Sequence, residues 1–174
     1  MFVALSAAVP VFAQSDFEAI KARAEAGDAQ AQYDLGVMYD IGEGVVQDDV
    51  ESAKWHRLAA EQGNANSQFI LGAMYKDGEG VAQNYQEAVK WYRLAAEQGD
   101  ALAQFFLGDM YGDGRGVTQS YAKAYLWFSL AVAGGETYAS AHRDNASARL
   151  SPQALEEAKT QATRCFESNF QDCD

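Results

Sequence analysis

The sequence repeats itself every 36 residues, and this period constrains its fold more than any other feature. Four glycines share one column of the repeat: Gly27, Gly63, Gly99 and Gly135. All three tryptophans share another: Trp55, Trp91 and Trp127. Residues 27–62 and 63–98 are identical at 21 of 36 positions, and residues 63–98 and 99–134 at 18. Tandem units of this size bury a core only by stacking on their neighbours, so the sequence predicts a solenoid.

Each repeat is predicted to form two helices joined by a Gly-x-Gly-Val loop. The first helices have caps at Asp28, Asn64 and Asp100, and the second helices have caps at Asp48, Asn84 and Ser120. Glu51 and Glu87 stand three residues after their caps and predict capping boxes. Trp55, Leu58 and Ala59 recur at helical spacing and are predicted to form the buried face of the second helix.

The two ends of the chain differ from the repeats and are predicted to cap them. We expect a capping helix over residues 14–26, repeats over 27–62, 63–98 and 99–134, and a degenerate repeat with a C-terminal cap over 135–174. Ser151-Pro152 predicts the start of the last helix, because serine is a good N-cap and proline suits the first helical position.

Composition excludes several classes of function. The net charge is −12, with 13 Lys+Arg against 25 Asp+Glu, and such a chain repels nucleic acid and anionic membranes. No apolar run is long enough to cross a bilayer. Two histidines and two cysteines are too few to suggest a metal site, and no motif predicts a cofactor.

The N-terminus and the cysteines favour export. Residues 1–13 are uncharged and end in Val11-Phe12-Ala13, which predicts a signal peptide cleaved before Gln14 and a periplasmic or secreted protein. The alternative is an apolar first helix of the fold. Cys165 and Cys173 are predicted to form a disulfide in an oxidising compartment, and the alternative is a pair of free thiols in a frayed tail.

The repeated unit resembles the Sel-1-like repeat. The motif runs from Ala65-Asn66-Ser67-Gln68 through Gly80-Val81 to Trp91 and Gly99. The 34-residue tetratricopeptide repeat is a related unit with a different period. The resemblance implies an all-α, right-handed α/α solenoid. It also implies a non-catalytic scaffold or adaptor of the bacterial envelope, which we expect to be monomeric and to bind a protein or peptide.

One stripe of the first helix differs between the repeats and is predicted to face the partner in the concave groove. Its positions are spaced i, i+4, i+7 and i+11, which places them on one helical face. The candidate binding residues on it are Asp34, Val37, Ile70, Ala73, Asp77, Leu102, Phe106, Asp109 and Asp113. Ile70, Leu102 and Phe106 are predicted to form an apolar patch that anchors the partner, unless a capping segment covers them. The aspartates would favour Lys or Arg beside that anchor.

A hydrolase is the alternative function. Ser120 and Lys123 match the S-x-x-K motif of penicillin-recognising enzymes, and some cysteine-rich relatives are described as β-lactamases. The K-T-G and S-D-N elements of that chemistry are absent from the sequence, and Ser120 occupies the cap column. His56 and His142 lie in different units and are predicted to be structural or surface residues. We therefore predict no catalytic residues.

Overall fold

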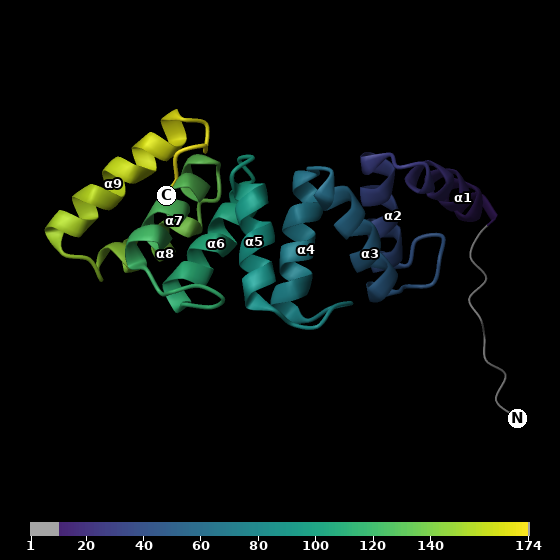
Figure 1. Cartoon of the computed structure of the whole chain (residues 1–174), viewed down its shortest axis with the longest axis horizontal. Coiled ribbons are helices and arrows are strands. Elements are labelled where there is room, and N and C mark those ends of the chain that lie inside the picture. Colours follow the sequence, from purple (N-terminus) through teal and green to yellow (C-terminus); the bar gives the residue numbers. More distant parts are fainter. Residues whose placement is uncertain (1–10, 174) are drawn as a thin grey trace, which may run out of the picture.

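The structure, a computed structural model, describes residues 11–173 and contains no β-strand in that range. Its helices are α1 (Val11–Glu25), α2 (Ala29–Ile41), α3 (Asp49–Glu61), α4 (Ala65–Asp77), α5 (Tyr85–Ala96), α6 (Ala101–Asp113), α7 (Tyr121–Ala133), α8 (Ala139–Ser147) and α9 (Pro152–Glu167). They follow one another in a row from α1 at one end to α9 at the other (Figure 1). Successive helices up to α8 pack together, and α9 packs back on α7. The predicted all-α solenoid is confirmed.

The predicted caps begin the helices of all three repeats. The Asp28, Asn64 and Asp100 side chains accept hydrogen bonds from the backbone N–H groups three residues later. The side chains of Asp48, Asn84 and Ser120 do the same for the second helices. Each cap satisfies backbone donors that the first helical turn leaves without partners.

The predicted capping boxes do not form. Glu51 pairs with Lys54 at 3.1 Å, and Glu87 pairs with Lys90 at 3.6 Å. The backbone N–H of Asp48 donates instead to the carbonyl oxygen of Tyr39 at 3.0 Å, and the same bond recurs in the other repeats. The last turn of a first helix has spare carbonyl groups, so it replaces the glutamate as the acceptor.

The Gly-x-Gly loops of the second and third repeats, which connect the two helices of a repeat, also pack against the preceding repeat. A Cβ atom on Gly80 would lie 1.9 Å from the carbonyl oxygen of Asp49, in the preceding repeat. A Cβ atom on Gly116 would lie 2.3 Å from the carbonyl oxygen of Tyr85. The loop backbone therefore packs directly on the start of the neighbouring second helix, which only glycine allows.

The tryptophan column is buried as predicted, but the leucine beside it is not buried in every repeat. Trp55, Trp91 and Trp127 are 8%, 5% and 1% exposed. Leu58 and Leu94 are each 37% exposed, whereas Leu130 is 3% exposed. The predicted burial of Leu58 is thus wrong. Leu130 lies on α7, the second helix that α9 also contacts.

One buried glutamine of each first helix, at Gln32, Gln68 and Gln104, donates to a backbone carbonyl of the preceding unit. The Gln62 side chain donates to the side-chain oxygen of Gln32 at 2.7 Å, and Gln98 donates to Gln68 in the same way. Gln32 in turn donates to the carbonyl of Ala24 at 3.1 Å. The bonds to the carbonyl groups satisfy polar groups between units and so align them, whereas the exposed Gln62 and Gln98 bond within their own repeats.

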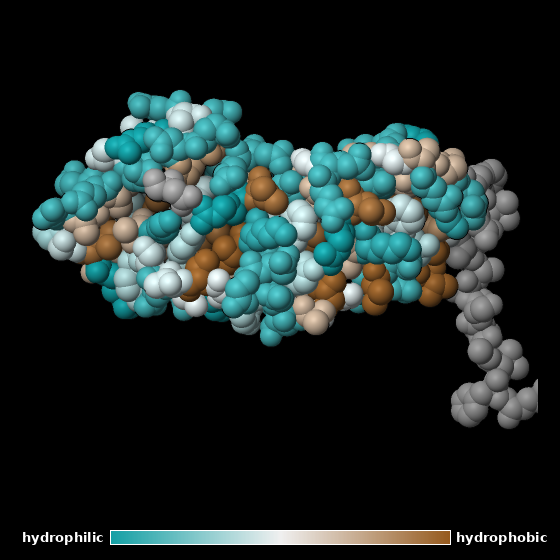
Figure 2. Space-filling model, viewed as in Figure 1, coloured by the Kyte–Doolittle hydropathy of each residue, from teal (hydrophilic) through white to brown (hydrophobic). Residues whose placement is uncertain are grey.

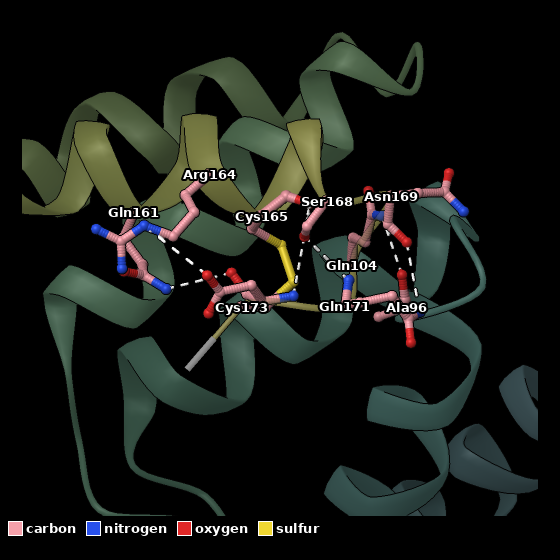
Figure 3. The surroundings of a disulfide bond; sticks show 10 residues. Ala96, Gln104, Gln161, Arg164, Cys165, Ser168, Asn169, Gln171 and Cys173 are labelled. Carbon is pink, nitrogen blue, oxygen red and sulfur yellow. Dashed lines mark hydrogen bonds and ion pairs between the residues drawn. A yellow bond between two sulfur atoms is a disulfide. The ribbon is translucent and has the colours of Figure 1, made fainter.

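A helix lies near each end of the described residues. Helix α1 begins at Val11, so the predicted cleavage point lies within it, and the first ten residues of the predicted signal peptide lie outside the described residues. At the other end, Cys165 and Cys173 are joined by a disulfide (Figure 3). No helix between residues 11 and 173 has the length and apolar character needed to cross a membrane.

Candidate partner-binding surface

The predicted stripe lies on α2, α4 and α6, and all of its residues have solvent access. Six members are exposed: Gln30, Ile41, Asn66, Asp77, Leu102 and Asp113. Six are half-buried: Asp34, Val37, Ile70, Ala73, Phe106 and Asp109. Figure 2 shows, for the face it presents, that apolar surface is divided into small patches among hydrophilic side chains. The variable columns of the repeat are therefore surface columns.

The stripe continues onto α8, which sequence analysis did not predict. Adding 36 to the numbers of the third-repeat residues gives Tyr138, His142, Asn145 and Arg149. All four are exposed. The faded sequence of the fourth unit hid this relationship, although the 36-residue spacing itself could have found it. The fourth unit replaces the aspartates of these columns with Asn145 and Arg149.

A pocket of about 530 Å³ lies where the stripe crosses from α6 to α8. Asp109 and Asp113 line it on the α6 side, and Tyr121 and Phe128 line it from α7. His142, Asn145 and Arg149 complete it on the α8 side. The pocket therefore brings two predicted site residues together with side chains that sequence analysis had not assigned to a site.

Aromatic rings line part of this pocket. The His142 ring lies 5.0 Å from the ring of Phe105 and 5.4 Å from that of Phe128, measured between centroids. The Arg149 guanidinium, which also lines the pocket, lies 5.5 Å from the centroid of Tyr121. Such rings offer apolar contact and also attract cations at their faces.

Arg115 neutralises part of the acidic wall. Its Nη2 lies 2.8 Å from a carboxylate oxygen of Asp109 and 2.6 Å from one of Asp113. Burial and the negative charge of Asp113 nevertheless raise the pKa of the Asp109 carboxyl above its usual value. Arg115 and the nearby His142 and Lys76 act in the opposite direction without reversing this shift. The carboxylate of Asp109 is thus only partly compensated.

Phe106 is packed rather than open. Its ring stacks on Tyr92 at 5.5 Å, lies 5.8 Å from Phe69, and has the ammonium group of Lys76 5.6 Å from its centroid. The same lysine pairs with Asp77 at 2.6 Å. Leu102 is 38% exposed and Ile70 is half-buried. Among the three residues of the predicted apolar patch, Leu102 therefore offers the most open surface.

The first repeat contributes a separate depression. Asp34 and Val37 line a pocket of about 350 Å³ between α1 and α2, together with Ile20 and Tyr33. Asp34 accepts a hydrogen bond from Gln30 at 2.8 Å. Ile70 and Ala73, on α4, lie on the stripe between this depression and the larger pocket. The predicted residues thus form a line of shallow sites instead of one cavity.

The residues considered for hydrolase chemistry have structural roles. The hydroxyl of Ser120 accepts a hydrogen bond from the backbone N–H of Lys123 at 3.2 Å, which is the predicted cap. The ammonium of Lys123 lies 5.5 Å from the ring centroid of Tyr111. His56 is fully buried, with Nδ1 3.3 Å from the hydroxyl of Ser67. Between residues 11 and 173 no group of three His, Cys, Asp or Glu side chains is placed to hold a metal ion.

Comparison with known proteins agrees with this architecture. Residues 29–64, 65–100 and 101–136 each match the family model of the Sel1 repeat. A crystal structure of a Sel1 repeat protein from Oxalobacter formigenes is 39% identical, with a TM-score of 0.65 over 67% of this chain and 48% of that one.

A second similar structure is a protective antigen present in uropathogenic Escherichia coli strains, which displays an SLR fold. It is 26% identical, with a TM-score of 0.67 over 88% of this chain and 42% of that one. The chain therefore spans less than half the length of either structure. No curated protein sequence matches it.

Proposed function

The chain belongs to the Sel1 repeat family, and from that premise we propose that it is a protein-interaction scaffold of the bacterial cell envelope. The stripe of the first helices binds an extended or helical segment of a partner. One observation carries the proposal: every residue in the variable columns of four successive units has at least partial solvent access, while the repeated Gln, Leu, Gly and Met columns of the first helices are buried. Repeat proteins use such continuous surfaces to hold partners.

The chemistry of the stripe describes the segment that would fit. Leu102 and the half-buried Ile70 offer apolar contacts one repeat apart. Asp34, Asp77 and Asp113 supply negative charge along the same line. A segment with apolar side chains and neighbouring Lys or Arg complements both features, and the net charge of −12 would speed its approach.

The envelope location is part of the proposal. The uncharged N-terminal run with Val11-Phe12-Ala13 supports export, and the Cys165–Cys173 disulfide suits an oxidising compartment. Expression of the whole chain in a bacterium, followed by intact mass measurement of the periplasmic fraction, tests this. A protein that begins at Gln14 is expected. Full-length protein confined to the cytoplasm would contradict the location.

Binding is tested with a displayed library of random 12-residue peptides. The library is selected on the immobilised chain, and the enriched peptides are titrated by fluorescence anisotropy at low and moderate salt. We expect apolar residues flanked by Lys or Arg to be enriched. We also expect Leu102→Ala, at an exposed stripe position, to weaken peptide binding by about tenfold, because it removes an apolar contact to the peptide.

The matched control is Leu94→Ala. Leu94 is exposed to nearly the same extent as Leu102, but it lies on a second helix, outside the stripe. Equal loss of binding in the two variants would place the site elsewhere. No enrichment over an uncoated surface would reject peptide binding by the stripe.

A further inference from the structure

The pocket between α6, α7 and α8 combines features that select one class of side chain. The half-buried carboxylate of Asp109 lines it, and so do the rings of His142 and Phe128. A ligand that fills this space must offer a cation to the carboxylate and a flat or apolar surface to the rings. Arginine meets both requirements, because its planar guanidinium stacks on aromatic rings and binds carboxylates through paired N–H groups.

We propose that this pocket binds an arginine side chain of the partner segment and so sets the position of that segment on the solenoid. The proposal rests on the proposed function, because it assigns the site to a partner. It goes further by naming the side chain and the unit that receives it. The guanidinium lies between Asp109 and Asn145, and the aliphatic part of the side chain packs on Phe128.

The charges around the pocket support this placement. Arg115 already bonds to one oxygen of Asp109, yet the pKa of the Asp109 carboxyl stays raised, because burial and Asp113 outweigh the nearby cations. A further cation would therefore stabilise the carboxylate. Arg149, which also lines the pocket, lies against Tyr121, with its guanidinium 5.5 Å from the ring centroid.

The residues in the column of His142 explain why the fourth unit forms such a site and the second and third repeats do not. In the second and third repeats the column of His142 holds Ile70 and Phe106, and Phe106 is packed into an aromatic cluster. In the fourth unit the exposed His142 packs against Phe105 and Phe128 at the pocket wall. Asn145 in the column of Asp109 adds an amide oxygen that accepts from a guanidinium without adding a second negative charge.

The test needs no partner protein. Nα-acetyl-arginine methylamide is titrated into the ¹⁵N-labelled full chain at pH 7.5, where free histidine is mostly neutral. The acetylated methylamides of citrulline, lysine and norleucine serve as probes that remove the charge, the planar shape or both. We expect saturable shifts of the Gly112, Asn145 and Ala146 amides with arginine. Citrulline is expected to bind about tenfold more weakly, since it lacks the charge of the guanidinium.

Substitutions in the pocket are expected to weaken or to tighten arginine binding, depending on the charge that they remove or add. Asp109→Asn is expected to weaken arginine binding by about tenfold. Asn145→Asp, at an exposed position, is expected to tighten it severalfold, because a second carboxylate faces the guanidinium. The matched control is Glu156→Gln on α9, which also removes one charge and one ion pair, here with Lys159 at 2.7 Å.

Equal binding of arginine and citrulline, or shifts spread over the whole chain, would overturn the proposal. An unchanged affinity in both Asp109→Asn and Asn145→Asp would do the same. Because Asn145→Asp predicts a gain, loss of folding in Asp109→Asn would not hide the answer. A negative result here with successful peptide selection would reject the pocket and keep the stripe as the binding surface. Arginine binding without any selected peptide would keep the pocket and reject the scaffold.

Discussion

The imidazole ring of His56 lies against the backbone of Gly36 so closely that a Cβ atom on the glycine would lie 2.8 Å from the ring. The same relationship recurs between Gly72 and Tyr92 at 2.7 Å, and between Gly108 and Phe128 at 2.8 Å. A ring of each second helix thus fills the space that a glycine leaves on the first helix. The Leu-Gly pair of the repeat is therefore a packing requirement.

This contact predicts different outcomes for two glycines of the same helix. Gly108→Ala should destabilise the protein by about 1–2 kcal/mol, because overpacking against Phe128 costs more than the alanine gains in helix propensity. Gly112→Ala should be neutral or stabilising by up to about 1 kcal/mol, since its Cβ would meet only the Ala124 Cβ at 3.8 Å. Urea unfolding followed by circular dichroism measures both. Equal effects would contradict the contact.

The buried His56 makes stability depend on pH. Burial lowers the pKa of His56 from 6.5 to about 4, and Nε2 of its ring has no hydrogen-bond partner. The unfolded chain therefore takes up a proton more readily than the folded chain as the pH falls from 6.5 to 4, and stability is lost over this interval. The loss is up to about 3 kcal/mol.

His56→Phe should remove this contribution, because phenylalanine occupies the same column at Phe128 without titrating. The free energy of unfolding is measured from pH 7.5 to 4.0, and the difference between wild type and variant isolates His56 from the carboxylates. The exposed His142 supplies the control. The difference in unfolding free energy between proteins with His56 and with His56→Phe should be the same when both also carry His142→Gln. A wild-type curve parallel to that of His56→Phe would contradict the prediction.

The C-terminal disulfide is predicted to hold the tail against the solenoid. The backbone N–H of Phe170 donates to the carbonyl of Cys165 at 2.8 Å, and that of Asp172 donates to the hydroxyl of Ser168 at 2.9 Å. Reduction should cost at most about 2–3 kcal/mol, because the closed loop is short. Hydrogen exchange measures it: the two amides should lose protection in reductant, while that of Leu107 in α6 should not. Unchanged protection of the tail would show that packing alone holds it.

The packing of Phe106 changes what its substitution is expected to do. Phe106→Ala removes a stacked ring between Tyr92 and Lys76 and should destabilise the fold by about 1–3 kcal/mol. Leu102→Ala, on the same helix and 38% exposed, should cost less than about 0.5 kcal/mol. Thermal and urea unfolding compare the two. If Phe106→Ala proved as stable as the wild type, the ring would be free to act as the partner's anchor.

The 36-residue period of the sequence alone determined the helices, their N-caps and the order of the units. This worked because capping and glycine turns are local, so residues such as Asp28, Ser120 and Gly63 act within a few positions of their own place in the chain. The tryptophan column was also predictable, because a repeated large apolar residue at helical spacing has to be buried. The variable stripe followed from the same comparison of repeats.

The contacts between units were decided by the tertiary structure. Leu58 and Leu130 share one column of the repeat, yet only Leu130 is buried, on the helix against which α9 packs. Phe106 is covered by Tyr92 from the preceding repeat, and the larger pocket forms only because the degenerate fourth unit brings His142 and Asn145 beside Asp109. Burial of a side chain depends on what stacks against it, and the sequence of one repeat does not contain that information.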